Sequence, residues 1–257
     1  MALVDTPLRL AVLAFVAMWA AAHLGIRLRR LKKESEVDEL AQFGVIVGAA
    51  LTLLGLLIGF SYSMAVSRYD QRKNLEEEEA NAIGTEYLRA GLLSAADAAK
   101  VRGGLKSYLD ERVLFYDARD EQRVERINAS SAVISADLWS IVQSAALAQP
   151  GANTALAAAG LNSVLNSQGY TQAAWWNRIP IAAWGLMLSI GICCNVLLGY
   201  STPHPEIKVH SVFFILPALV AVSFFLISEL DSPRGGLIRV QPVNLLSVLH
   251  SWPSSRP

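Results

Sequence analysis

The chain has 257 residues with 22 basic and 22 acidic side chains, so its formal net charge is zero, and its mean hydropathy is +0.36. Charged residues make up 17% of the chain, against about 25% in an ordinary soluble domain, whereas 53% are hydrophobic. This composition disfavours a soluble enzyme, a disordered chain and a secreted disulfide scaffold, and the balanced charge disfavours a nucleic-acid partner.

Four stretches of the sequence contain no Asp, Glu, Lys or Arg. They are residues 10–26, 43–66, 179–200 and 211–228. A hydrocarbon core about 30 Å thick is crossed by about 20 helical residues, and these stretches approach or exceed that length. The sequence therefore predicts an all-α, multi-pass membrane protein with four transmembrane helices in contact with the lipid bilayer.

The first stretch has two interpretations. Ala20, Ala21 and Ala22 resemble the cleavage site of a signal peptide. The residues before the stretch carry no net charge, however, and a dense basic cluster at 27–33 follows it. That order favours a retained membrane anchor over a cleaved signal.

The second span carries a stripe of small residues. Its members are Gly44, Gly48, Gly55 and Gly59. At 100° per residue they fall within an arc of about 60°, and Tyr62 continues the same face. Such a stripe lets helices approach closely. It indicates either plain helix packing or a helix that lines a pore or forms the subunit contact around one.

Residues 67–178 form a polar block that is too long for a simple loop, and we expect it to be helical and extramembrane. Its first helix continues out of the second span to residue 91. A second helix begins after Ser94, which has Asp97 three residues on, and a third precedes a break at Pro150 and Gly151. A short helix over 155–165 follows.

Two apolar faces are predicted in this block. Val101, Leu105, Tyr108, Phe115 and Tyr116 share one face of the second helix, together with Arg112. Val124, Ile127, Ile134, Leu138, Ile141 and Val142 lie on one side of the third helix. The periodicity of both sets is that of amphipathic helices packed against other helices.

Four consecutive glutamates, Glu76 to Glu79, form an acidic run within the first helix of the block. One interpretation is a solvated helix face. The other is a site for a cation or for arginine from a neighbouring subunit.

The predicted divisions of the chain follow from these elements. Residues 1–42 hold the first span and a charged loop, 43–66 the second span, and 67–178 the helical block. Residues 179–230 hold the third and fourth spans, and 231–257 form a C-terminal tail. Within this plan we find no nucleophile elbow, metalloprotease motif, phosphate loop or dinucleotide fingerprint, and no metal-ligand spacing. We therefore expect no enzyme activity, cofactor or metal.

Three segments together resemble a bestrophin-like family of bacterial integral membrane proteins. The first runs from Gly59 to Arg72 and includes GFSYSMA and RYDQR. The second, EANAIGTEYLRA, begins at Glu79, and the third, ELDSPRGGLIRV, begins at Glu229. The polar candidates that these motifs supply are Arg68, Asp70, Arg72, Glu79, Asn81, Glu86, Arg89, Glu229, Asp231 and Arg234.

The resemblance implies a relative of the bestrophin anion channels, which are oligomers around a central pore. It places the second span at a largely apolar neck, with Phe60, Tyr62 and the glycine face near the path of small anions. It also implies a homo-oligomer in a bacterial plasma membrane, with the helical block in the cytoplasm. Basic residues at the span ends number six on one side and seven on the other, so the positive-inside rule does not decide the orientation.

Two functions from different classes remain open on this sequence. The first is a passive anion channel, with chloride as the expected ion. The second is a non-conducting scaffold or regulatory protein whose helical block binds a partner. Glu229 and Asp231 lie just beyond the last span, but two carboxylates are fewer than a calcium cage uses.

Overall fold

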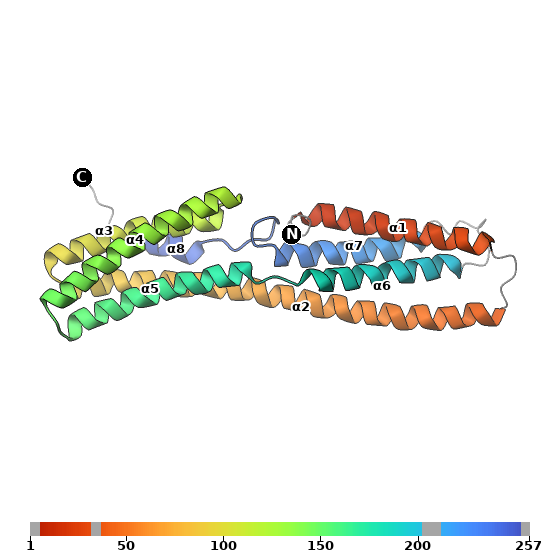
Figure 1. The fold of residues 1–257 in the computed structure, drawn as a ribbon, viewed down its shortest axis with the longest axis horizontal. Coiled ribbons are helices and arrows are strands. Elements are labelled where there is room, and N and C mark those ends of the chain that lie inside the picture. Colours follow the sequence, from red (N-terminus) through yellow and green to blue (C-terminus); the bar gives the residue numbers. More distant parts are fainter. Residues whose placement is uncertain (1–5, 32–36, 202–211, 253–257) are drawn as a thin grey trace. The chain divides into compact units, whose positions relative to one another are not determined.

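The structure, a computed structural model, describes residues 6–31, 37–201 and 212–252, and every regular element in these ranges is helical. The elements, drawn in Figure 1, are α1 Pro7–Leu31, α2 Val37–Arg89, the short 3₁₀ helix η1 Ala90–Leu92, α3 Ala95–Asp117, α4 Glu121–Ala148, α5 Ala152–Trp176, α6 Ile181–Tyr200, α7 Val212–Asp231 and α8 Val243–Ser251. The all-α prediction is confirmed.

Five helical stretches are long and apolar enough to cross a membrane. They are Pro7–Leu31, Phe43–Leu92, Glu121–Ala148, Ala152–Tyr200 and Phe213–Asp231. The predicted spans fall within four of them, apart from residue 211, which lies outside the described residues, and Val212, which is the first residue of α7 but precedes the stretch that begins at Phe213. The stretch Glu121–Ala148 is additional, so length and composition alone do not yield a count of four spans.

The chain divides into two compact units. Unit 1 comprises Met1–Arg68 and Arg178–Ile238, and unit 2 comprises Tyr69–Asn177 and Arg239–Pro257. The helix α2 runs without a break from Val37 to Arg89. Its residues up to Arg68 belong to unit 1 and those from Tyr69 onward belong to unit 2. This continuity confirms the helix that the sequence predicts beyond the second span.

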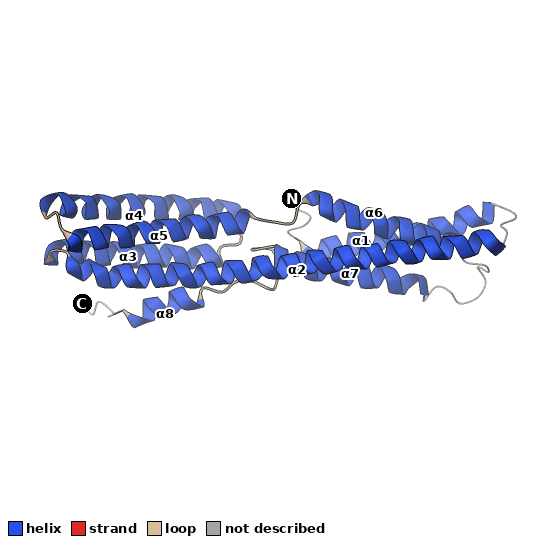
Figure 2. Ribbon diagram, turned by 90° about the horizontal axis from the view of Figure 1, so that it is seen from below, coloured by secondary structure: helices blue, strands red, loops and turns tan. Residues whose placement is uncertain are grey.

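Unit 1 contains α1, α6, α7 and the first part of α2, which run side by side in both ribbon views (Figures 1 and 2). Its core includes Met18, Leu54, Met187 and Phe224. The helices α1 and α6 approach each other closely at Gly25 and Gly199. A Cβ on Gly25 would overlap the carbonyl oxygen of Val196, so the missing side chain permits the close contact.

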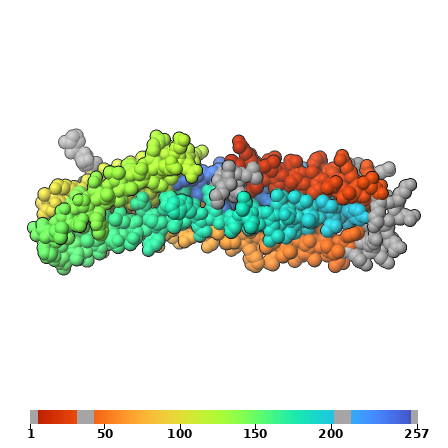
Figure 3. Space-filling model, viewed as in Figure 1, coloured from red at the N-terminus to blue at the C-terminus, as the bar shows by residue number. Residues whose placement is uncertain are grey.

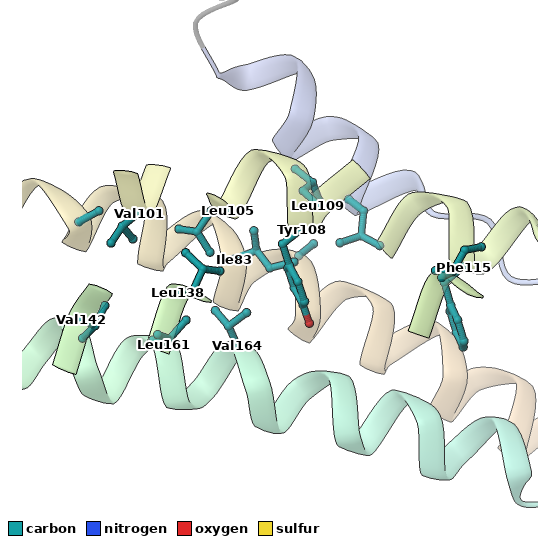
Figure 4. Packing of buried hydrophobic residues seen from close by; sticks show 14 of the residues in the cluster. Ile83, Val101, Leu105, Tyr108, Leu109, Phe115, Leu138, Val142, Leu161 and Val164 are labelled. Carbon is teal, nitrogen blue, oxygen red and sulfur yellow. The ribbon is translucent and has the colours of Figure 1, made fainter. Parts of the chain in front are cut away.

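Unit 2 packs α3, α4 and α5 against the last part of α2, with α8 alongside α3. Figure 4 shows labelled apolar side chains from α2, α3, α4 and α5 pointing toward one another. Ile83, Leu105, Leu138 and Leu161 are all at most 1% exposed. The predicted faces of α3 and α4 therefore form this core, with Ile134 and Ile141 partly buried at its edge.

Local signals set the helix boundaries in unit 2. The Ser94 hydroxyl accepts a hydrogen bond from the Asp97 amide at 3.2 Å, as a helix N-cap does. The helices α4 and α5 are separated at Pro150 and Gly151, as predicted.

Two elements differ from the sequence prediction. The helix predicted over 155–165 extends over Ala152–Trp176, because Val164, Thr171 and Trp175 are buried against the other helices of unit 2. Residues 243–251 form the helix α8 within what the sequence indicated only as a tail. Tertiary contacts stabilise both segments beyond their intrinsic helix propensity.

Candidate functional site

The glycine face of α2 is open within the single chain. A Cβ built on Gly44, Gly48, Gly55 or Gly59 meets no atom within 4 Å among the described residues. The stripe therefore serves no helix contact inside the described part of this chain.

A different face of the same span is packed. Val47, Leu54, Ser61 and Ala65 are buried, and they recur at separations of seven, seven and four residues. The Ser61 hydroxyl lies 3.5 Å from the Met187 sulfur of α6. At 100° per residue this buried stripe lies about a third of a turn from the glycine stripe, so among the described residues the span of α2 is packed on one side and open on the glycine side.

The two predicted aromatic residues of the span occupy different faces. Tyr62 follows Gly44 by about five full turns and so continues the glycine face. Phe60 precedes Tyr62 by two residues, a rotation of about 200° around the helix axis, so it lies on a different face. Both are exposed, Phe60 by 61% and Tyr62 by 44%.

A carboxylate holds three segments of unit 1 together where the predicted spans end. Asp231, the last residue of α7, accepts hydrogen bonds from the backbone amide of Ile179 at 3.1 and 3.2 Å. Arg68 of α2 donates to the same carboxylate at 3.2 Å. The Asp231 side chain is 1% exposed and that of Arg68 is 14% exposed. This contact fixes α2 relative to α7 and to the start of α6.

Glu229 organises the turn that follows α7. Its carboxylate accepts hydrogen bonds from the backbone amides of Leu237 and Ile238, the latter at 3.2 Å. A Cβ on Gly236 would lie too close to this carboxylate, so glycine is required for the chain to wrap around it. The motif that begins at Glu229 is therefore a turn built around a buried carboxylate.

A buried polar network joins three helices of unit 2. Glu79 of α2 forms an ion pair with Arg112 of α3, and both side chains are 0% exposed. The same carboxylate accepts hydrogen bonds from the Tyr116 hydroxyl at 3.4 Å and the Thr171 hydroxyl at 3.2 Å. Burial first, and then the Glu79 charge, raise the pKa of Tyr116, which keeps the phenol protonated as a donor.

Glu76 caps the C-terminal helix. Its carboxylate accepts hydrogen bonds from the backbone amides of Asn244 and Leu245, both at 2.9 Å, and from the Asn244 side chain at 2.6 Å. Anionic groups stabilise helix N-termini in this way. Trp252, the residue directly after α8, stacks on Tyr87 with ring centroids 4.1 Å apart.

The glutamate run therefore serves two different purposes. Glu77 and Glu78 are exposed, as a solvated face requires. That interpretation is wrong for Glu76 and Glu79, which are 1% and 0% exposed. Helical periodicity explains the division, because residues three apart share a face. The arginine that pairs with Glu79 comes from the same chain.

The remaining motif residues do not gather at one point. Asp70 and Asn81 are exposed, Arg89 and Arg234 are half-buried, and Arg72 and Glu86 are buried. The sequence reasoning missed Glu76 and Thr171 as members of the polar contacts. No group of three His, Cys, Asp or Glu side chains in the described part of the chain is placed to hold a metal ion.

The sequence profile of the Bestrophin-like domain matches residues 9–245. The chain belongs to the Bestrophin-like family. This match confirms the resemblance carried by the motifs at Gly59, Glu79 and Glu229, and it identifies the apolar helices as those of a membrane protein. No functionally curated protein matches the sequence.

Crystal structures of a bacterial bestrophin homologue from Klebsiella pneumoniae share the fold. One single-residue variant matches with a TM-score of 0.65 at 15% identity, covering 96% of this chain and 99% of that chain. Another variant gives 0.63 at 14% identity, covering 93% and 96%. A further structure gives 0.61 at 16% identity, covering 94% and 99%. At this identity the Bestrophin-like chain and the homologue are related in fold.

Proposed function

We propose that this protein is a passive anion channel, with chloride as the permeant ion, formed by several copies of the chain around a central pore. The segment 43–66 of α2 lines the pore or forms the subunit contact around it. No catalytic step is required, since passage through a pore needs a path and a means of gating. The family membership and the geometry of α2 support this proposal.

The open glycine face of α2 carries the argument. In the 18-residue apolar stretch of α2 that could cross a membrane, 11% of the residues are buried. In the equivalent stretch of α7, 44% are buried. The packed stripe at Leu54 and Ala65 shows that α2 is nevertheless anchored to its own chain. A helix that packs against its own chain on one face and leaves a glycine-lined face uncovered is suited to contact a partner subunit or to line a pore.

Four spans are favoured over five. The proposed spans are α1, the first part of α2, α6 and α7. The additional candidate, α4, begins with Glu121, Arg123, Glu125 and Arg126, and Leu138 and Val142 of α4 lie in the core of unit 2. Charges at the start of a helix that already packs one apolar face against protein favour an extramembrane position.

The surface of unit 2 supports a homo-oligomer. Figure 3 shows α4 and α5 forming a continuous face of this unit. Large apolar side chains are exposed on these helices: Val133, Trp139, Leu147, Leu156, Tyr170 and Trp176. Residues 127–177 contain a single charge, Asp137. A broad apolar surface with so little charge is typical of protein contacts.

The motif carboxylates and arginines are proposed to position α2 and not to conduct. Arg68 and Asp231 fix the end of the span, and Glu79 fixes the helix within unit 2. The proposed location is the plasma membrane of a bacterium, with unit 2 in the cytoplasm.

The exposed face of α4 and α5 also favours a second function. A non-conducting scaffold would use this face to bind a partner protein, and it would need no open pore. The two functions differ in one measurable property, which is ion passage.

Chloride efflux from liposomes that hold the purified protein tests the proposal. The channel predicts efflux above that of empty liposomes, with protein folding and insertion verified by protease protection. Inserted, folded protein that gives no efflux at any pH or membrane potential tested would favour the scaffold.

A further inference from the structure

Glu86 is a buried carboxyl group without a hydrogen-bond partner. Its side chain is 0% exposed, and within the part of the chain that the structure describes neither carboxyl oxygen accepts a hydrogen bond. Glu79, seven residues earlier on α2, is equally buried but is paired with Arg112. A buried carboxylate is costly unless it is paired, so Glu86 favours the neutral, protonated form.

The helix α5 covers this carboxyl group at a glycine. A Cβ on Gly160 would overlap Oε2 of Glu86 and would lie 2.9 Å from Nη1 of Arg89. Only the absence of a side chain lets α5 come this close. The contact excludes water from the carboxyl group. The sequence of α5 contains no Asp, Glu, Lys, Arg or His, so this helix supplies no charged side chain in place of the water.

Arg89 is the charged side chain that acts on Glu86. On α2, Arg89 is half-buried and favours the ionised form of Glu86. On α3, Arg102 donates to the carbonyl oxygen of Tyr87 at 3.1 Å and stacks on the Tyr87 ring. On α4, Asp137 is exposed.

The helices α8, η1 and α5 carry few titratable side chains. The helix α8 carries His250, which is exposed, and η1 carries no titratable side chain. Tyr170, the one titratable residue of α5, is 62% exposed. Burial outweighs the field of Arg89 and raises the pKa of Glu86 to about 7.

We propose that Glu86 and Gly160 form a proton-operated contact between α2 and α5. When Glu86 is protonated, α5 packs closely on α2. When Glu86 is ionised, the carboxylate draws water or a cation toward itself and the contact opens. The ligand of this site is a proton, and the inference does not depend on whether the chain conducts ions.

The direction of the pH effect follows from linkage. The packed state binds a proton with a pKa of about 7, whereas in the opened state the group has its ordinary value of 4.5. Between these values the packed state holds more protons, so raising the pH weakens the contact. One proton changes the opening equilibrium by at most about tenfold per pH unit, and above pH 7 the effect levels off.

Hydrogen–deuterium exchange of the full-length protein in lipid nanodiscs tests this contact. Exchange in peptides from residues 152–176 is followed from pH 5 to pH 8 and corrected for the intrinsic rate at each pH. The wild type is expected to lose protection by up to about tenfold per pH unit up to pH 7. Glu86→Gln, which resembles the protonated acid, is expected to show no such loss.

Two controls make the outcome specific. Glu78→Gln removes an exposed charge from the same helix and should retain the wild-type response. If Glu86→Gln does not fold, Gly160→Ala replaces it, because the added Cβ displaces the carboxyl group into water. Its control is Gly169→Ala, where a Cβ on α5 meets no atom within 4 Å. A wild type whose protection is independent of pH, or a Glu86→Gln variant with the wild-type response, would overturn the proposal.

Discussion

Glu79 and Arg112 lie 33 residues apart in the chain and form an ion pair in which neither side chain is exposed to solvent. The pair joins α2 to α3, and the Thr171 hydroxyl extends the network to α5. Arg112 also lies over the ring of Phe115, 4.3 Å from its centroid. The charges are thus located in the middle of the apolar core of unit 2.

Breaking this ion pair should destabilise unit 2 strongly. Arg112→Met leaves the Glu79 carboxylate buried without its cation, and we expect a loss of about 3–5 kcal/mol in the free energy of unfolding. The measurement is a denaturant titration followed by tryptophan fluorescence, with the exposed Arg119→Met as the control.

A double variant separates the loss of pairing from the loss of packing. Glu79→Leu combined with Arg112→Met removes both buried charges and should regain most of the stability. A double variant no more stable than Arg112→Met, or an Arg119→Met loss of the same size, would contradict this account.

The cap on α8 gives a second prediction. Glu76→Ala removes the carboxylate that accepts hydrogen bonds from Asn244 and Leu245. Loss of a helix cap costs about 1–2 kcal/mol, so the amides of Val243–Ser251 should exchange faster with deuterium. Glu77→Ala, an exposed neighbour, should leave their exchange unchanged. Equal exchange in the two variants would show that α8 is held by its apolar contacts alone.

The crossing of α1 and α6 gives a third prediction. In Gly199→Ala the new methyl group would overlap the carbonyl oxygen of Ala22, which forces the two helices apart. Overpacking of this kind costs about 1–3 kcal/mol and should lower the thermal unfolding midpoint. At Gly185 on the same helix a Cβ meets no atom within 4 Å, so Gly185→Ala should not lower the midpoint. A Gly199→Ala midpoint equal to that of Gly185→Ala would argue against the close crossing.

Elements with local signals were predictable from the sequence. The cap at Ser94 and the break at Pro150 and Gly151 depend on residues a few positions apart, so chemistry within one turn determines them. The apolar faces of α3 and α4 were predictable for a related reason. Burial of residues such as Leu105 and Leu138 follows directly from helical periodicity.

Contacts between distant segments were not predictable in the same way. The pairing of Glu79 with Arg112 depends on how α2 and α3 align after they pack, and no short-range pattern specifies that alignment. The helix α8 has nine residues, too few to be stable alone, and it depends on Glu76 and on Trp252 stacking against Tyr87. The periodicity within the glutamate run was the one available signal that Glu76 and Glu79 share a buried face.

The central claim is that the open glycine face of α2 borders an ion path or the subunit contact around it. Chloride efflux from liposomes is compared for the wild type, Gly59→Leu and Gly185→Leu, with the mass of each assembly measured in parallel. Gly185 is the matched control, because it too is a span glycine where a Cβ meets no atom within 4 Å.

We predict that Gly59→Leu changes efflux or assembly, since a bulky side chain fills the face that a partner or pore requires, and that Gly185→Leu behaves as the wild type. Wild-type efflux and wild-type assembly from Gly59→Leu would contradict the claim.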